Sequence, residues 1–196
     1  MIARLAGRVF EKHPNRLVVD VAGVGYDVQV PLSTFYTAGE PGTEIALRIH
    51  THVREDQLSL YGFATALELT MFERLIAVSG IGPKLALSVL SGIETRDLIG
   101  AILRNDLARL TAIPGVGKKT AERMCVELRD RMPKAVATGA VPSPGDALRD
   151  DLVSALINLG YHRQAIDKSL DKLVSDASEQ RFEDVLRSAL KDLSRA

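Results

Sequence analysis

The sequence predicts a multi-domain α+β protein, with a small β-barrel followed by two helical domains. Residues 1–63 alternate apolar and polar side chains over short segments, which is typical of strands. Residues 64–132 change to helical spacing, interrupted twice by a Gly-X-Gly sequence. Residues 133–147 contain three prolines and two glycines, and predict a flexible linker to a last domain at 148–196.

Five strands are expected in the first domain, at residues 2–10, 17–21, 26–30, 45–53 and 58–63. The connections between them are short. A closed barrel is favoured over a flat sheet, because closure removes exposed edges. The OB-type barrel is the natural candidate for a domain of this size.

The connection between the last two strands carries two adjacent carboxylates, Glu55 and Asp56. A solvated turn explains them, unless the tip faces a polyanion. On the preceding strand, His50 and His52 lie on one face, but the sequence places no third metal ligand nearby. We therefore expect surface or interface histidines and no metal site.

Two glycine hairpins, at 80–82 (Gly-Ile-Gly) and 115–117 (Gly-Val-Gly), are the most informative feature of the second domain. Aligning them gives an offset of 35 residues, and each is followed by lysine within two residues. The flanking apolar residues then also agree: Phe72 with Leu107, Leu75 with Leu110, Val78 with Ile113, and Ala86 with Ala121. The pattern predicts a duplicated helix-hairpin-helix unit.

Three interpretations of these hairpins compete. A nucleotide-binding P-loop is excluded, because Ala112 stands where the first glycine is required and Lys119 where a Ser or Thr would bind magnesium. The second interpretation is that both loops are tight turns that bind no ligand. This would explain a single loop, but it is a weaker explanation for two loops in matching register. N–H groups at the start of a helix form an anion site, so we favour binding to DNA phosphates.

Phosphate binding would use the hairpin backbones and the basic side chains that follow them. Ile81 and Val116 would point inward and hold each hairpin against its helices. Such contacts read no bases, so binding should be sequence-neutral and steeply salt-dependent. The candidate DNA-binding residues are Gly80, Gly82, Lys84, Gly115, Gly117, Lys118, Lys119 and Arg123.

The charge distribution agrees with this interpretation, although the net charge is zero. Residues 65–134 hold 11 basic and 8 acidic side chains and are the only third of the chain with a positive balance. No catalytic cluster stands out, so no intrinsic catalytic site is expected. A DNA-processing enzyme with the same hairpins, such as a nuclease or glycosylase, remains the alternative.

The composition is that of a globular protein of the cytoplasm. The only cysteine, Cys125, lies in a helical pattern and is expected to fill core space. No apolar run approaches the ~20 residues of a membrane span. The N-terminus alternates apolar residues with arginines, unlike a signal peptide.

The sequence of the last domain predicts three amphipathic helices, at 148–159, 163–174 and 182–193. So small a bundle has a thin core, so marginal stability or docking to a partner is expected. Leu156, Leu159 and Tyr161 are either part of that core or an apolar patch for a partner.

Taken in order, several motifs resemble the bacterial RuvA family of Holliday-junction branch-migration proteins. The resemblance covers nearly all of residues 1–132 and, more loosely, the last domain through Ala-Leu-Ile-Asn-Leu-Gly-Tyr. The motifs are Met-Ile-Ala-Arg-Leu-Ala-Gly, Gly-Val-Gly-Tyr, Val-Arg-Glu-Asp followed by Leu-Tyr-Gly-Phe, Gly-Ile-Gly-Pro-Lys-Leu-Ala-Leu, and Pro-Gly-Val-Gly-Lys-Lys-Thr-Ala-Glu-Arg.

The resemblance implies a homotetramer, or an octamer made of two, that holds an open four-way DNA junction during recombination, DNA repair and the SOS response to DNA damage. The hairpin residues would grip the arms, and Glu55 and Asp56 would form an acidic pin at the centre. The last domain would recruit a RuvB-type hexameric ATPase through Leu156, Leu159 and Tyr161, and a RuvC-type resolvase would join the complex. The motor would hydrolyse ATP, so this chain would need no cofactor and would be the non-catalytic subunit of a helicase complex.

Overall fold

The structure is a computed structural model of the chain, and it describes residues 1–129, 132, 152, 153, 155–157, 159–161, 165, 166, 169 and 182–193. The chain divides into two compact units, Met1–Ala137 and Thr138–Ala196. The predicted linker at 133–147 and most of the predicted helix at 163–174 lie outside the described residues. Both stay predictions, as do the domain boundaries.

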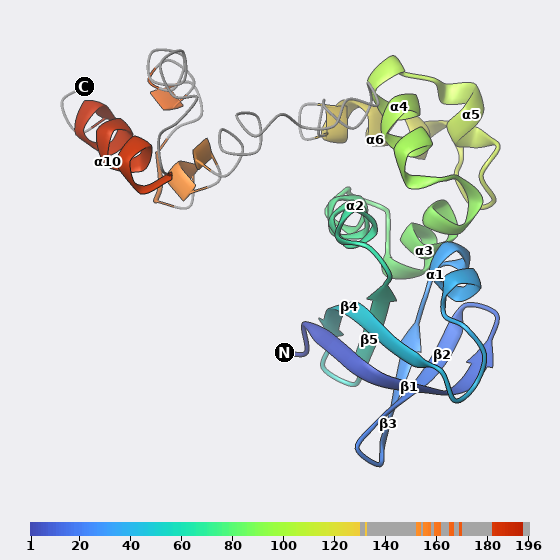
Figure 1. Cartoon of the computed structure of the whole chain (residues 1–196). Coiled ribbons are helices and arrows are strands. Elements are labelled where there is room, and N and C mark those ends of the chain that lie inside the picture. The colour runs from blue at the N-terminus through green and yellow to red at the C-terminus, as the bar shows by residue number, and fades with distance from the viewer. Residues whose placement is uncertain are drawn as a thin grey trace. The chain divides into compact units, whose positions relative to one another are not determined.

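Five strands close into a barrel in the order β1-β2-β3-β5-β4 (Figure 1). Neighbouring strands are antiparallel except β3 and β5, which pair in parallel. The closed barrel predicted from the alternation is therefore confirmed. Its strands are β1 (Arg4–His13), β2 (Arg16–Val21), β3 (Val24–Gln29), β4 (Glu44–Val53) and β5 (Leu58–Phe63).

A short helix that the sequence pattern did not predict, α1 (Leu32–Thr37), lies between β3 and β4. Its β-branched and aromatic residues are weak helix formers, and no side chain caps its start. Tertiary contacts hold it instead. The N–H of Leu32 donates to Ser91 Oγ at 3.0 Å, and the buried Thr34 Oγ1 accepts from the N–H of Ala64 at 3.0 Å.

A buried carboxylate joins the barrel to the helices. Glu68 lies in the first turn of α2 (Ala66–Ile76) and forms a capping box with Thr65. Its carboxylate accepts hydrogen bonds from the Thr65 N–H, at 3.0 Å, and from the hydroxyl of Ser33 on α1. A charged acceptor with several donors tolerates burial, so this network fixes α2 against α1.

The remaining helices of the first unit are α3 (Pro83–Gly92), α4 (Thr95–Arg104), α5 (Leu107–Thr111) and α6 (Lys118–Leu128). Two neighbouring residues cap the connection between α4 and α5. Asn105 ends α4 in the left-handed conformation, and the Asp106 side chain accepts from the Arg109 N–H to start α5.

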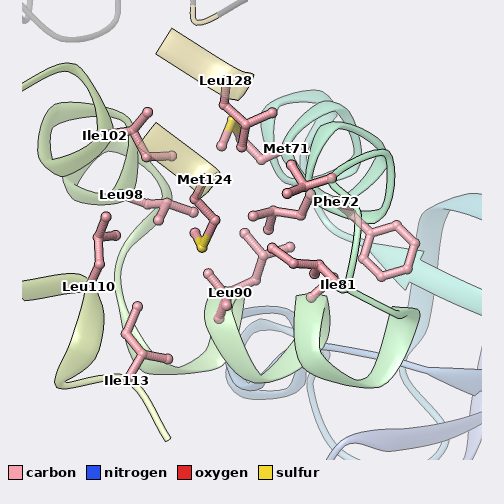
Figure 2. Close-up of a cluster of buried hydrophobic side chains, with 14 of the residues drawn as sticks. Met71, Phe72, Ile81, Leu90, Leu98, Ile102, Leu110, Ile113, Met124 and Leu128 are labelled. Carbon is pink, nitrogen blue, oxygen red and sulfur yellow. The ribbon is translucent and has the colours of Figure 1, made fainter. Parts of the chain in front are cut away.

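One apolar core serves both halves of the helical region. Figure 2 shows Met71, Phe72 and Leu90 meeting Leu110, Met124 and others in a single cluster. Because each half contributes side chains to the same core, neither repeat packs as an independent domain.

In the second unit, α10 (Phe182–Leu193) matches the predicted third helix. It buries Val185 and Ala189 in a small core with Leu152, Leu156 and Ile166. Among the described residues of the chain, no helix has the length and apolar character needed to cross a membrane.

Candidate nucleic-acid interface

The two glycine hairpins have the same backbone conformation. The φ angle is +88° at Gly80 and +87° at Gly115, and it is −85° at Gly82 and −84° at Gly117. Between the glycines, Ile81 and Val116 each donate their N–H to a carbonyl three residues earlier, at 3.0 Å in both hairpins. The duplication predicted from the sequence is therefore confirmed in the backbone.

The two glycines of each hairpin are required for different reasons. Gly80 and Gly115 have a left-handed φ that strains any other residue. Gly82 and Gly117 have an ordinary negative φ, and a Cβ atom at either position would meet no atom within 4 Å. Within the described chain, nothing demands a glycine at these two positions. A group that approaches the backbone from outside would demand it.

Each second glycine also begins a helix. Gly82 precedes α3 and Gly117 precedes α6, and neither helix has a side-chain cap at its start. The first-turn N–H groups are therefore available to an anion, and the helix dipole favours one. Pro83 has no N–H, whereas Lys118 at the matching position of the second hairpin has one.

The lysines beside the hairpins are free to meet a ligand. Lys84, Lys118 and Lys119 are exposed, and none of them has an ion-pair partner among the described residues. They follow hairpins held from inside by Ile81 and Val116, whose predicted inward position is confirmed by their burial. The backbone that carries the lysine side chains is thus held in place by the core.

Arg123 differs from the lysines, because its guanidinium is already bonded within the chain. Its Nη1 donates to the carbonyl oxygen of Ser79 at 2.8 Å, which links α6 to the first hairpin. In return, Leu85 of α3 lies against the second hairpin, where a Cβ on Gly115 would come within 3.1 Å of Leu85 Cδ1. Nothing in the sequence spacing signalled these exchanged contacts.

The predicted acidic tip is exposed at the end of the β4–β5 hairpin. The N–H of Arg54 donates to the carbonyl of Gln57 at 2.8 Å and closes the turn. Glu55 and Asp56 between them have no ion-pair partner in the described part of the chain. Their charges are therefore not neutralised locally.

The tip and the hairpins border the same cleft. It has a volume of about 700 Å³ and is lined by Arg54 and Gln57 from the tip, Pro83 and Lys84 beside the first hairpin, and Pro114 beside the second. Arg54 and Gln57, which flank the two carboxylates, therefore line the same cleft as residues that adjoin each hairpin. No sequence pattern indicates this arrangement, which depends on how the barrel packs against the helices.

The two histidines lie near this face, on the barrel wall beside α2. His50 Nδ1 is 3.3 Å from Glu73 Oε1, and its ring packs edge-on against Phe72. His52 accepts a hydrogen bond from Arg54 Nε at 3.3 Å. His50 is thus an interface histidine, as expected. In the described ranges, no cluster of three His, Cys, Asp or Glu residues is arranged to hold a metal.

Cys125 is buried in the core that supports the second hairpin, so its predicted packing role is confirmed. Burial removes the thiol from water and raises its pKa, because the charged thiolate loses solvation.

The apolar residues proposed for the last domain separate into two groups. Leu156 is fully buried in the core of the second unit, and Tyr161 packs against that core. For Leu156 the core interpretation holds, so it does not offer a surface to a partner. Leu159 is 59% exposed and is the member of this group that can meet one.

Comparison with known proteins accounts for most of the chain. Residues 1–62 match the family model of the RuvA N terminal domain, residues 72–130 a SAM-like helix-hairpin-helix tandem, and residues 147–194 the RuvA C-terminal domain. None of these three models describes a catalytic domain.

Similar curated proteins span the same length. A protein of Geotalea daltonii is 48% identical over 98% of this chain and 99% of its own. One of Solibacter usitatus is 49% identical over 97% and 98%, and one of Geobacter sulfurreducens is 47% identical over 98% and 99%. Each is named Holliday junction branch migration complex subunit RuvA.

Proposed function

The chain belongs to the RuvA family, and on that premise we propose that it binds four-way DNA junctions through their sugar–phosphate backbones. The observation that carries the proposal is the pair of equivalent hairpins. Each has a glycine with open space beside its Cα, a helix start without a side-chain cap, and an exposed lysine that has no ion-pair partner among the described residues. Backbone contacts carry no base information, so DNA can slide through the site without sticking at particular sequences.

The acidic tip would supply the selection for a junction. Glu55 and Asp56 are exposed between Arg54 and Gln57, which line the cleft beside the hairpins, and like charges repel more strongly beside a low-dielectric protein than in bulk water. A continuous duplex would bring phosphates against these carboxylates. An open junction leaves a gap between its strands at the crossover, where the carboxylates would meet less negative charge.

The full assembly is also part of the proposal. We infer a homotetramer, or an octamer made of two, that places the acidic tips around the crossover and acts in the cytoplasm. A RuvB-type hexameric ATPase would supply the energy for branch migration, and a RuvC-type resolvase would cut the junction. This chain would act as the scaffold and contribute no catalytic residue.

The lysines provide the test of DNA binding. Lys118→Ala with Lys119→Ala should weaken junction binding and reduce the slope of log K against log salt by about one for each phosphate that is no longer neutralised. Arg96→Ala with Arg104→Ala removes the same charge from α4, where both side chains are exposed, and should have little effect. Junction affinity that is unchanged by the lysine pair at every salt concentration would refute the hairpin assignment.

The exposed Leu159 provides the test of motor recruitment. Leu159→Ser should leave junction binding intact and reduce branch migration driven by a RuvB-type ATPase. Removal of residues 148–196 should abolish migration and also spare junction binding. Loss of junction binding in either variant would contradict the proposed separation of roles.

A further inference from the structure

The cleft between the acidic tip and the hairpins contains polar groups that phosphate binding does not use. On its barrel side, Ser59 and Tyr61 are only 9% and 6% exposed, yet both line the cleft. Neither hydroxyl has a hydrogen-bond partner among the residues that the structure describes. The barrel therefore holds both side chains in place, and each offers a hydroxyl that can donate and accept a hydrogen bond in the cleft.

Other walls of the cleft carry neutral side chains of the same kind. Gln29 and Gln57 contribute amides, and Ser88 of α3 contributes a hydroxyl from the opposite side. Within the described residues, none of the three side chains makes a hydrogen bond. Amides and hydroxyls can each both donate and accept, which suits the edge of a nucleobase better than a phosphate.

The ring of Tyr61 is not available for stacking. It packs against Phe72 with ring centres 5.0 Å apart, and the His52 ring meets it edge-on at 6.3 Å. Only its hydroxyl edge remains for a ligand. A base in this cleft would therefore be held by hydrogen bonds, and not by aromatic stacking of the kind common in single-strand binding proteins.

We propose that the cleft binds an unpaired nucleobase of the DNA strand at the crossover, an inference that rests on the function proposed above. The charges of the lining favour one orientation: the exposed Lys84 and Arg54 would hold the phosphates at the mouth, whereas the neutral hydroxyls and amides would take the base. The nucleotide would thus enter base first. Because the wall groups both donate and accept, any of the four bases fits, and the site stays neutral to sequence.

The test uses the full chain and a four-way junction with 2-aminopurine beside the crossover. Binding of the unaltered protein should raise the fluorescence, because the probe leaves the base stack. Tyr61→Phe with Ser59→Ala removes only the two hydroxyls and should abolish most of that rise. Junction affinity should fall roughly two- to tenfold for each hydroxyl, while duplex binding stays the same.

Two matched variants complete the experiment. Tyr36→Phe removes an exposed hydroxyl on α1, away from the cleft lining, and should behave like the unaltered protein. Gln57→Ala changes an exposed group at the rim, so it should lower the fluorescence rise without risk to the core.

Three outcomes are decisive. An undiminished fluorescence rise in the hydroxyl and Gln57 variants would overturn the base site. A mass of these variants in light scattering that differs from the mass of the unaltered protein would overturn it too, because the cleft would then be a contact between copies of the chain. If the unaltered protein does not prefer the junction to a duplex, the proposed function has failed instead.

Discussion

Arg123 Nη1 donates a hydrogen bond of 2.8 Å to the carbonyl oxygen of Ser79, across 44 residues of sequence. This bond carries a side chain of the second repeat to the hairpin of the first. Leu85 makes the reciprocal contact with Gly115. The spacing between the two candidate phosphate sites is therefore fixed by side chains exchanged between the repeats, in addition to their common core.

Arg123→Lys should separate positioning from charge. Lysine keeps the positive charge, but its flexible ammonium holds the Ser79 carbonyl less firmly than a planar guanidinium. We expect junction affinity to fall by about fivefold, equivalent to about 1 kcal/mol for a weakened hydrogen bond, with an unchanged salt slope. If Arg123→Ala, like Lys118→Ala, lowers the slope while Arg123→Lys binds normally, then Arg123 acts as a phosphate contact.

The paired glycines predict opposite effects on stability and binding. Gly82→Ala with Gly117→Ala should hardly change the unfolding free energy, because neither position is strained or crowded. It should weaken junction binding, because each new methyl group occupies the place of a phosphate. Gly80→Ala should cost about 1–2 kcal/mol of stability, because its left-handed φ strains an L residue. Urea unfolding and junction titration of both variants check this; a Gly82/Gly117 variant with normal affinity would contradict it.

Glu68 should matter for stability and not for selectivity. Glu68→Ala leaves the hydroxyl of Ser33 and the N–H of Thr65 without their acceptor, which should cost about 1–3 kcal/mol in urea unfolding. Glu73→Ala is the control, because the exposed Glu73 pairs with His50 at the surface, and such pairs contribute about 0–1 kcal/mol. Equal losses in the two variants would argue against a buried network.

The burial of Cys125 should make the unfolding free energy depend on pH in alkaline solution. The folded state raises the thiol pKa and so favours the neutral form. This contribution is complete below the pKa of the unfolded thiol, about 8.5, and is lost as the pH rises through the higher pKa of the folded state. The unfolding free energy of the unaltered protein should therefore fall more steeply above about pH 8.5 than that of Cys125→Ala. Parallel curves for the two proteins would refute the assignment.

Local patterns in the sequence predicted much of this fold. The alternation in residues 1–63 predicted the five strands of the barrel, and the 35-residue offset predicted two equivalent hairpins. Helix α1 was not predicted, because its own residues favour other conformations. It is held instead by contacts such as the hydrogen bond from Leu32 to Ser91, which is 59 residues away in the sequence.

The sequence named candidate site residues one by one, but it did not indicate how they are arranged. Glycine and lysine spacing identified both hairpins, because a tight turn and a helix start are local structures. The bond from Arg123 to Ser79, and the cleft that joins Tyr61 to the acidic tip, depend on tertiary packing. No periodicity in a single sequence records such contacts.

The central claim is that backbone clamps hold the DNA while the acidic tip selects the junction. The most direct measurement compares the affinities of the full chain for a four-way junction and for a duplex of the same arm sequence, before and after Glu55→Gln with Asp56→Asn. We predict a strong preference for the junction, reduced in the neutral variant because its duplex binding becomes tighter. Equal affinity of the unaltered protein for both DNAs, or a preference that survives neutralisation in full, would contradict the account.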